Sequence, residues 1–172
     1  GAPGAHSAIP GPANAPWLVL LHGMAQDHRV FDMQIAAFAN DHHILAVDLP
    51  GHGAAAGHAG PYDLTVMTDA VIAAMDRAGA HAATIWGTHT GASVALALAV
   101  AAPERVERLV LEGPVTPGAG LSVVAETVAQ TRHALLKDGL DAARAVWWSA
   151  GCWYRLIKRD PDTRRAAEQR AI

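Results

Sequence analysis

The chain has 172 residues, of which 51% are apolar and 17% are charged, with a formal net charge of -3. A chain of this length and composition can bury one sizeable core, and its high apolar fraction excludes global disorder. The slight acidic excess excludes a nucleic-acid-binding protein that works through a broad basic face. The longest apolar run, residues 92–102, is too short to cross a bilayer, so we expect no membrane span.

The single cysteine, Cys152, rules out an intrachain disulfide and a zinc site built from several cysteines. The histidines lack metal-ligand spacing along one helix face, so the sequence predicts no metal and no other cofactor. Residues 1–16 are rich in Gly, Pro and Ala and do not follow the pattern of a signal peptide. We expect a flexible lead-in there, and the compartment defaults to the cytoplasm.

Apolar runs of strand length alternate with helical patterns between residues 17 and 114. The first run is continuously apolar, as in strands that are buried on both faces of a parallel sheet. Strands are predicted at residues 17–21, 43–48, 82–86 and 106–111, and helices at 30–40, 64–78 and 92–102. The helix at 92–102 is almost wholly apolar, so we expect it to be buried. This alternation indicates a doubly wound α/β sheet.

The pattern changes after Pro117, where no further strand is predicted. Helices are predicted at residues 121–136, 139–149 and 161–172. The sequence therefore divides into a lead-in at 1–16, a core at 17–114 and a helical region at 115–172.

Three glycine-containing loops follow predicted strands and would meet at one edge of the sheet. Their sequences are His22-Gly23-Met24-Ala25, Asp48-Leu49-Pro50-Gly51-His52-Gly53 and Gly87-Thr88-His89-Thr90-Gly91. Ligands of open α/β sheets bind beyond the carboxyl ends of the strands. In order and spacing, these loops resemble those of the α/β-hydrolase superfamily from about residue 17 to residue 112.

The resemblance implies a mostly parallel α/β-hydrolase sheet, here incomplete, followed by a helical cap. The predicted strands would lie in the spatial order second, first, third, fourth. The loop at 87–91 is similar to the family's nucleophile elbow, a sharp strand-to-helix turn in which Gly87 and Gly91 must be small. The main-chain N–H groups of Met24 and Thr90 would then bind the oxyanion of a reaction intermediate.

His89 occupies the elbow position where the family usually has Ser, and otherwise Asp or Cys. A helix N-terminus disfavours a charged imidazole, so a neutral His89 could act as a general base on water or as a nucleophile through an acyl-imidazole. In the alternative interpretation, the elbow survives as structure and the usual acyl-serine chemistry is lost. Ser93 lies a helical turn further along the chain, so we reject it as a displaced nucleophile.

Glu112 ends the fourth predicted strand on the same side of the sheet as His89. Some members of the family place the catalytic acid there, so Glu112 could orient or charge-balance His89. The alternative is a strand-end carboxylate that caps a turn or faces water. His22, His52 and Asp48 are expected to hold glycine turns in place by hydrogen bonds.

The helical region carries aromatic residues around Cys152. As part of a cap, Trp148 and Trp153 would contact the substrate over an apolar pocket; the alternative is packing within a core. The sequence thus predicts a hydrolase for a small apolar ester, amide or related carbonyl compound. A noncatalytic ligand-binding or scaffold protein of the same fold is the alternative.

The four predicted strands leave both edges of the sheet open, which is unfavourable in water. Residues 1–16, the cap helices or another chain could cover these edges. We favour another chain, either a second copy in a homo-oligomer or a complementing C-terminal polypeptide. Besides this chain and a small-molecule substrate, no partner is predicted.

Overall fold

A computed structural model of the chain describes residues 5–115 and 122–149. The chain forms two compact units, Gly1–Thr116 and Pro117–Ile172. The boundary between them in the sequence lies two residues after the predicted one. The first unit contains a five-stranded sheet and the helices that cover it. The part of the second unit that the structure describes, residues 122–149, contains two helices.

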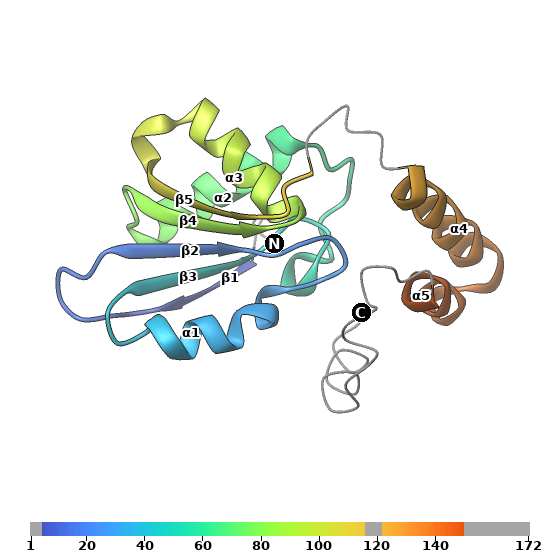
Figure 1. Cartoon of the computed structure of the whole chain (residues 1–172), viewed down its shortest axis with the longest axis horizontal. Helices are drawn as coiled ribbons and strands as arrows, with labels where there is room; N and C mark the ends of the chain where they lie inside the picture. Colours follow the sequence, from blue (N-terminus) through green and yellow to red (C-terminus); the bar gives the residue numbers. More distant parts are fainter. Residues whose placement is uncertain (1–4, 116–121, 150–172) are drawn as a thin grey trace. The chain divides into compact units, whose positions relative to one another are not determined.

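The sheet has the order β1-β3-β2-β4-β5 (Figure 1). Its strands are β1 (Ala5–Ile9), β2 (Trp17–Leu21), β3 (His43–Asp48), β4 (Ala83–Thr88) and β5 (Val106–Glu112). The four strands β3, β2, β4 and β5 run parallel to one another. The predicted mostly parallel sheet and the order of its four strands are confirmed, and the carboxyl ends of these strands share one edge.

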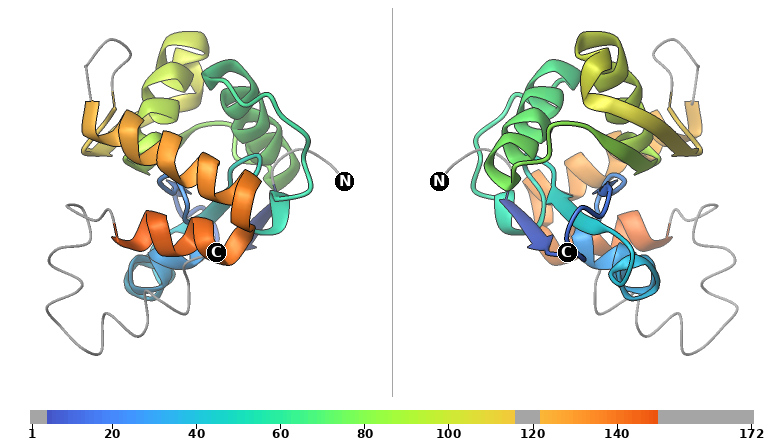
Figure 2. Two further views of the ribbon diagram at one scale, coloured as in Figure 1. Left: turned by 90° about the vertical axis from the view of Figure 1, so that its right-hand side faces the viewer. Right: turned by 90° about the vertical axis from the view of Figure 1, so that its left-hand side faces the viewer.

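The lead-in differs from the prediction because it contains a strand. β1 pairs antiparallel with β3, from Ala5 opposite Asp48 to Ile9 opposite Ile44. It therefore covers one of the two edges that the four predicted strands leave open, whereas β5 forms the opposite edge (Figure 2). Pairing with β1 satisfies main-chain N–H and C=O groups of β3 that would otherwise lack partners. The short sequence of β1 carries no strong strand pattern of its own.

The helices of the first unit lie close to their predicted ranges. They are η1 (His28–Phe31), α1 (Asp32–Phe38), η2 (Gly53–Ala55), α2 (Leu64–Ala78), α3 (Thr90–Ala101) and η3 (Pro103–Arg105). Asp63 caps α2 by accepting a hydrogen bond from the N–H of Val66 at 2.8 Å, and Gly79 ends it with a φ of 77°. The expected burial of α3 holds for its first half, where residues 91–95 are all buried, whereas Val100 near its end is 85% exposed.

The sheet has an apolar core on each face. Helices α2 and α3 cover one face, where Met75 and Leu98 pack with Leu21 and Ile85 (Figure 1). On the opposite face, Phe31 of η1 and Phe38 of α1 pack their rings against Trp86 of β4 and against aliphatic side chains of β2 and β3. The central strands β2 and β3 are buried on both faces, as a parallel sheet requires.

The second unit contains α4 (Ser122–Asp138) and α5 (Leu140–Ser149). Gly139 lies between them with a φ of 88°, a conformation that glycine adopts without strain. Both helices were predicted within a few residues, whereas the predicted helix at 161–172 lies outside the described residues. Among the described residues, no helix is both long and apolar enough to span a membrane.

Candidate active site

The turn between β4 and α3 has the geometry of a nucleophile elbow. His89 stands between the strand and the helix with φ 51° and ψ -112°, a strained conformation for a residue with a side chain. A Cβ on Gly87 would collide with the main chain of Gly91, and a Cβ on Gly91 would collide with the carbonyl oxygen of Leu21. Both glycines are therefore required by backbone contacts, as the sequence predicts.

His89 presents its side chain to solvent at this turn. Its Nδ1 lies 3.3 Å from the hydroxyl oxygen of Thr90, a long hydrogen bond. Its main-chain N–H donates to the carbonyl oxygen of Glu112 at 2.8 Å, which ties the elbow to the end of β5. The carbonyl of His89 accepts hydrogen bonds from the first turn of α3. The imidazole is thus held at the carboxyl edge of the sheet by its backbone.

Glu112 lies beside the elbow, in register with Thr88, but its side chain bonds elsewhere. The Oε1 atom accepts a hydrogen bond from the indole N–H of Trp86 at 2.7 Å. Within the described residues, the Glu112 carboxylate makes no hydrogen bond or ion pair with the His89 imidazole. The role of Glu112 as an orienting acid remains a prediction.

The loop after β2 lies against the elbow. A Cβ on Gly23 would be 3.1 Å from the Cβ of His89, so the two turns are in van der Waals proximity. Gln26 accepts a hydrogen bond from the N–H of Gly23 at 3.0 Å, and Ala25 has a φ of 57°. This hydrogen bond and the left-handed conformation of Ala25 define the path of the main chain around Met24.

The proposed oxyanion donors are the main-chain N–H groups of Met24 and Thr90. Within residues 5–115 and 122–149, neither N–H donates to another protein group. Thr90 is the first residue of α3, so its N–H belongs to the positive end of the helix dipole. Both donors therefore remain available to an anion, and their joint role stays a prediction.

His22 connects two of the three loops. Its Nε2 accepts a hydrogen bond from the N–H of Leu49 at 3.0 Å, and its Nδ1 donates to the carbonyl of Gly23 at 2.7 Å. These bonds require a neutral imidazole with the proton on Nδ1. Burial lowers the pKa of His22 from 6.5 to about 4, which is consistent with that state. His22 is thus a structural hydrogen-bonding residue, as expected.

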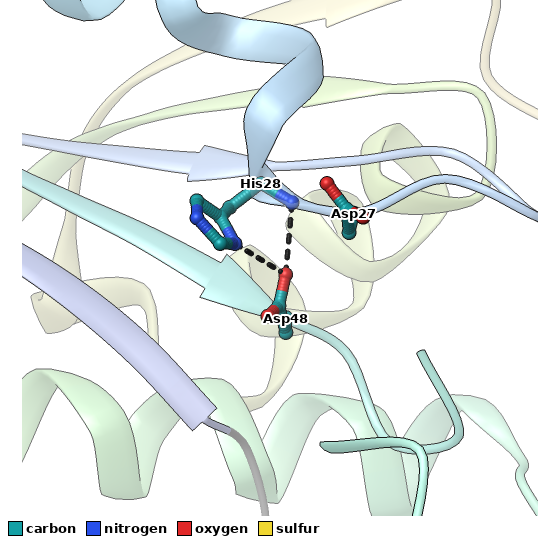
Figure 3. A group of neighbouring side chains, drawn as sticks. All are labelled: Asp27, His28 and Asp48. Carbon is teal, nitrogen blue, oxygen red and sulfur yellow. Dashed lines mark hydrogen bonds and ion pairs between the residues drawn. The ribbon is translucent and has the colours of Figure 1, made fainter. Parts of the chain in front are cut away.

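Asp48 holds the loop after β3 in place and also contacts a residue that the sequence analysis did not identify (Figure 3). Its Oδ1 accepts hydrogen bonds from the N–H and from Nδ1 of His28, at 2.8 and 2.9 Å. Its Oδ2 accepts from the N–H of Ala54 at 2.9 Å. No spacing rule indicates this pair, because η1 and β3 bring His28 and Asp48 together only in the folded chain.

Asp27, His28 and Asp48 place one potential metal-binding atom each within 4.8 Å of one another (Figure 3). However, Asp27 already accepts hydrogen bonds from Arg29 Nε at 2.9 and 3.0 Å. This guanidinium holds the pKa of the Asp27 carboxyl below its ordinary value. The carboxylate of Asp48 is occupied by main-chain donors, so the group holds the loops together by bonds within the protein.

Ser93 is engaged away from the elbow. Its hydroxyl donates to the carbonyl of Val115 at 2.6 Å and accepts from the N–H of Val115 at 3.1 Å. This pair of bonds attaches the segment after β5 to α3. It supports the rejection of Ser93 as a nucleophile.

The aromatic residues of the predicted cap belong to the second unit. Trp148 lies on α5 and is partly buried. Trp153 and Cys152 lie outside the described residues. The contact of Trp148 and Trp153 with a substrate therefore remains a prediction.

A family model described as the alpha/beta hydrolase fold matches residues 16–147, and the chain belongs to this family. A pimeloyl-[acyl-carrier protein] methyl ester esterase of Nitrosomonas europaea is 39% identical over 98 residues, which are 57% of this chain and 37% of that protein. The 3-oxoadipate enol-lactonase 2 of Acinetobacter baylyi is 29% identical over 101 residues, which are 59% of this chain and 38% of that protein.

Among solved structures, the enol-lactonase from Burkholderia xenovorans LB400 has the same fold. It superposes with a TM-score of 0.82 at 22% identity, over 98% of this chain and 64% of that one. The alignments with the two curated relatives span little more than a third of those proteins.

Proposed function

We propose that the chain acts in the hydrolysis of a small ester or lactone, with His89 as the reacting residue of the elbow. The observation that carries the proposal is the place of His89. It stands on the strained turn between β4 and α3, exposed to solvent and beside the unbonded N–H groups of Met24 and Thr90. The similarity to an ester esterase and to an enol-lactonase supports this class of substrate.

Two reaction schemes use the same geometry. In the first, a neutral His89 nitrogen attacks the carbonyl carbon, and the N–H groups of Met24 and Thr90 bind the oxyanion. The intermediate expels the alcohol, which takes the proton lost by the ring, and water then hydrolyses the acyl-imidazole to the acid. In the second, His89 removes a proton from water as the water attacks the carbonyl. Both schemes give one acid and one alcohol per ester.

A noncatalytic ligand-binding protein is the second candidate. It is favoured by the partners of His89, because within the described residues the imidazole contacts the Thr90 hydroxyl and no carboxylate. Such a protein would keep the two N–H donors as a binding site for a carboxylate. Both candidates therefore bind a small molecule at the same two N–H donors, but only the first converts it to products.

Hydrolysis of p-nitrophenyl acetate and p-nitrophenyl butyrate separates the candidates. We expect His89→Ala to lower kcat/KM by about 100-fold or more, because general base catalysis contributes at least that much. His81→Ala is the matched control, since His81 is an exposed histidine outside the site and should leave the rate unchanged. Equal rates in the wild type and His89→Ala would overturn the catalytic role.

Pre-steady-state kinetics then separates the two schemes. A burst of p-nitrophenol followed by slower turnover supports the acyl-imidazole, because the acylated protein accumulates. Turnover without a burst, slowed in deuterium oxide, supports the general base. If no ester is hydrolysed, calorimetric binding of butyrate that is lost when the Met24 loop is altered by Gly23→Val supports the ligand-binding candidate.

A further inference from the structure

The Met24 loop, residues 22–27, connects β2 to η1, and hydrogen bonds attach both of its ends to the end of β3. At the start of the loop, Nε2 of His22 accepts the N–H of Leu49 at 3.0 Å. After the loop, the N–H and Nδ1 of His28 both donate to Oδ1 of Asp48, at 2.8 and 2.9 Å (Figure 3). Both ends of the loop are therefore held by two consecutive residues, the last of β3 and the one that follows it.

The direction of the Met24 N–H is set at the start of this loop. Nδ1 of His22 donates to the carbonyl of Gly23 at 2.7 Å, and the His22 side chain is fully buried. Because a trans peptide group is planar, the carbonyl of Gly23 and the N–H of Met24 point in opposite directions. The bond that fixes this carbonyl therefore also fixes the orientation of the N–H.

The position of the same N–H relative to the elbow depends on the far end of the loop. The Thr90 N–H belongs to α3 and is held by the backbone contacts of the elbow. The Met24 loop, in contrast, turns at Met24 and Ala25 without regular secondary structure, so the bonds at its ends determine where it lies. The spacing between the two donors thus depends on the bond between His28 and Asp48.

Asp48 is a rigid attachment point for His28. Its side chain is 2% exposed, and its second oxygen, Oδ2, accepts the N–H of Ala54 at 2.9 Å, so both carboxylate oxygens are bonded. Hydrogen bonds to a carboxylate are shorter and stronger than those between neutral groups. The His28 side chain is 34% exposed, so its bond to Asp48, rather than dense packing, fixes the imidazole.

We propose that His28 is a positioning residue for the Met24 N–H. Its bond to Asp48 holds the end of the Met24 loop so that the Met24 and Thr90 N–H groups bind the same anion. This role rests on the proposed function, in which that anion is the oxyanion of an ester intermediate or a carboxylate. His28 is assigned no contact with the reacting atoms, and it acts through the main chain of the loop.

Two variants of the same shape separate the hydrogen bond from the volume of the side chain. His28→Asn keeps an N–H donor close to the position of Nδ1, whereas His28→Leu has the same branching and no donor. In heteronuclear NMR spectra of the 172-residue chain, we expect His28→Leu to shift the Met24 amide signal and to lower its heteronuclear NOE. His28→Asn should restore both, and the Thr90 amide should change in neither variant. A general loss of stability would instead affect both amides.

Kinetics and binding measure the consequence for the site. For p-nitrophenyl butyrate, His28→Leu should lower kcat by about 10-fold or more with little change in KM, because a misplaced donor weakens binding of the transition state. Calorimetric binding of butyrate should weaken in parallel, and His28→Asn should be close to the wild type in both measurements. As a matched control, His58→Ala should change neither, since the half-buried His58 contacts Tyr62 and lies outside the Met24 loop.

An unchanged Met24 amide signal in His28→Leu would overturn the proposal, as would equal losses in His28→Leu and His28→Asn. A shifted signal with unchanged kcat and unchanged butyrate affinity would overturn it too, because the loop would then move without consequence for the donor. A wild type that neither hydrolyses esters nor binds butyrate would overturn the proposed function, and the Met24 amide would still decide whether His28 positions this N–H. If His28→Leu does not fold, His28→Ala, which also lacks the donor, takes its place.

Discussion

The strands β2 and β5 have similar numbers of aliphatic residues but reach different environments. In β2, every residue after Trp17 is buried, because β3 and β4 flank the strand and helices cover both of its faces. In β5, no residue is fully buried, and from Arg108 onward exposed and half-buried side chains alternate. The position of a strand in the sheet order, more than its own composition, therefore decides how much of it leaves water.

The same contrast applies to the loops at the ends of these strands. The loop after β2 and the turn after β4 are held by backbone contacts and by buried bonds such as those of His22. The segment after β5 is attached through Ser93 and Val115. Substitutions in the central strands and around the elbow should consequently cost far more stability than substitutions on β5.

The largest effect is expected for Gly91→Val. A Cβ at Gly91 would meet the carbonyl oxygens of Leu21 and His22, which are main-chain atoms of the central sheet and cannot move aside. We expect a loss of about 4 kcal/mol in the free energy of unfolding, or a failure to fold. Urea denaturation monitored by circular dichroism measures this loss.

Two controls accompany this substitution. Gly57→Val should change stability by less than about 0.5 kcal/mol, since nothing lies within 4 Å of a Cβ at Gly57. His89→Ala should also be mild, because the imidazole is exposed. If His89→Ala were more destabilising than Gly91→Val, the elbow geometry described above would be wrong.

A pair of large-to-small substitutions compares the two strands directly. Leu20→Ala in β2 should cost about 3–4 kcal/mol, because the side chain is fully buried and leaves a cavity. Val110→Ala in β5 should cost about 0.5 kcal/mol, since the side chain is partly in water. Urea denaturation of both variants and of the wild type measures the two losses. Equal losses would show that β5 is as well covered as β2.

The pH dependence of stability tests the buried network of His22. Its pKa is about 4 in the folded chain and near 6.5 in the unfolded chain, so between these values the unfolded state binds the additional proton. The free energy of unfolding should therefore fall as the pH is lowered from 6.5 to 4, by about 3 kcal/mol in total from this group. Urea midpoints measured across this range should show the loss.

His22→Gln serves as the matched variant for this titration. Its side-chain oxygen can accept the N–H of Leu49 in place of Nε2, but the group does not titrate. We expect a smaller starting stability and a flatter dependence on pH between 6.5 and 4. An unchanged slope in His22→Gln would contradict the assignment of this pH dependence to His22.

Several features of the fold could be predicted from local patterns. The apolar run at 17–21 is continuous because the strand is buried on both faces. The residues at 64–78 show helical periodicity because the helix is buried on one face only. Both patterns can be recognised in the sequence. The glycines of the elbow were also recognisable, because each fills a position where a Cβ collides. In contrast, β1 was missed, because its pairing depends on the open edge of β3.

The candidate site was predicted less completely than the fold. Loop positions placed His89, Met24 and Thr90 at one edge of the sheet, since parallel strands bring their carboxyl ends together. The hydrogen-bond partners of the site's side chains could not be predicted from loop positions. Glu112 bonds to Trp86, which is 26 residues away, and Asp48 bonds to His28 across 20 residues.

The sequence by itself determined the alternation of strands and helices, the glycine turns between them and the residue type at the elbow. These follow from backbone sterics and from the period of apolar side chains, which act over a few residues. Only the tertiary structure decided that β1 covers β3 and that the Glu112 carboxylate meets an indole. Such outcomes depend on which backbone groups are still unpaired once the sheet has formed, and that is a property of the whole fold.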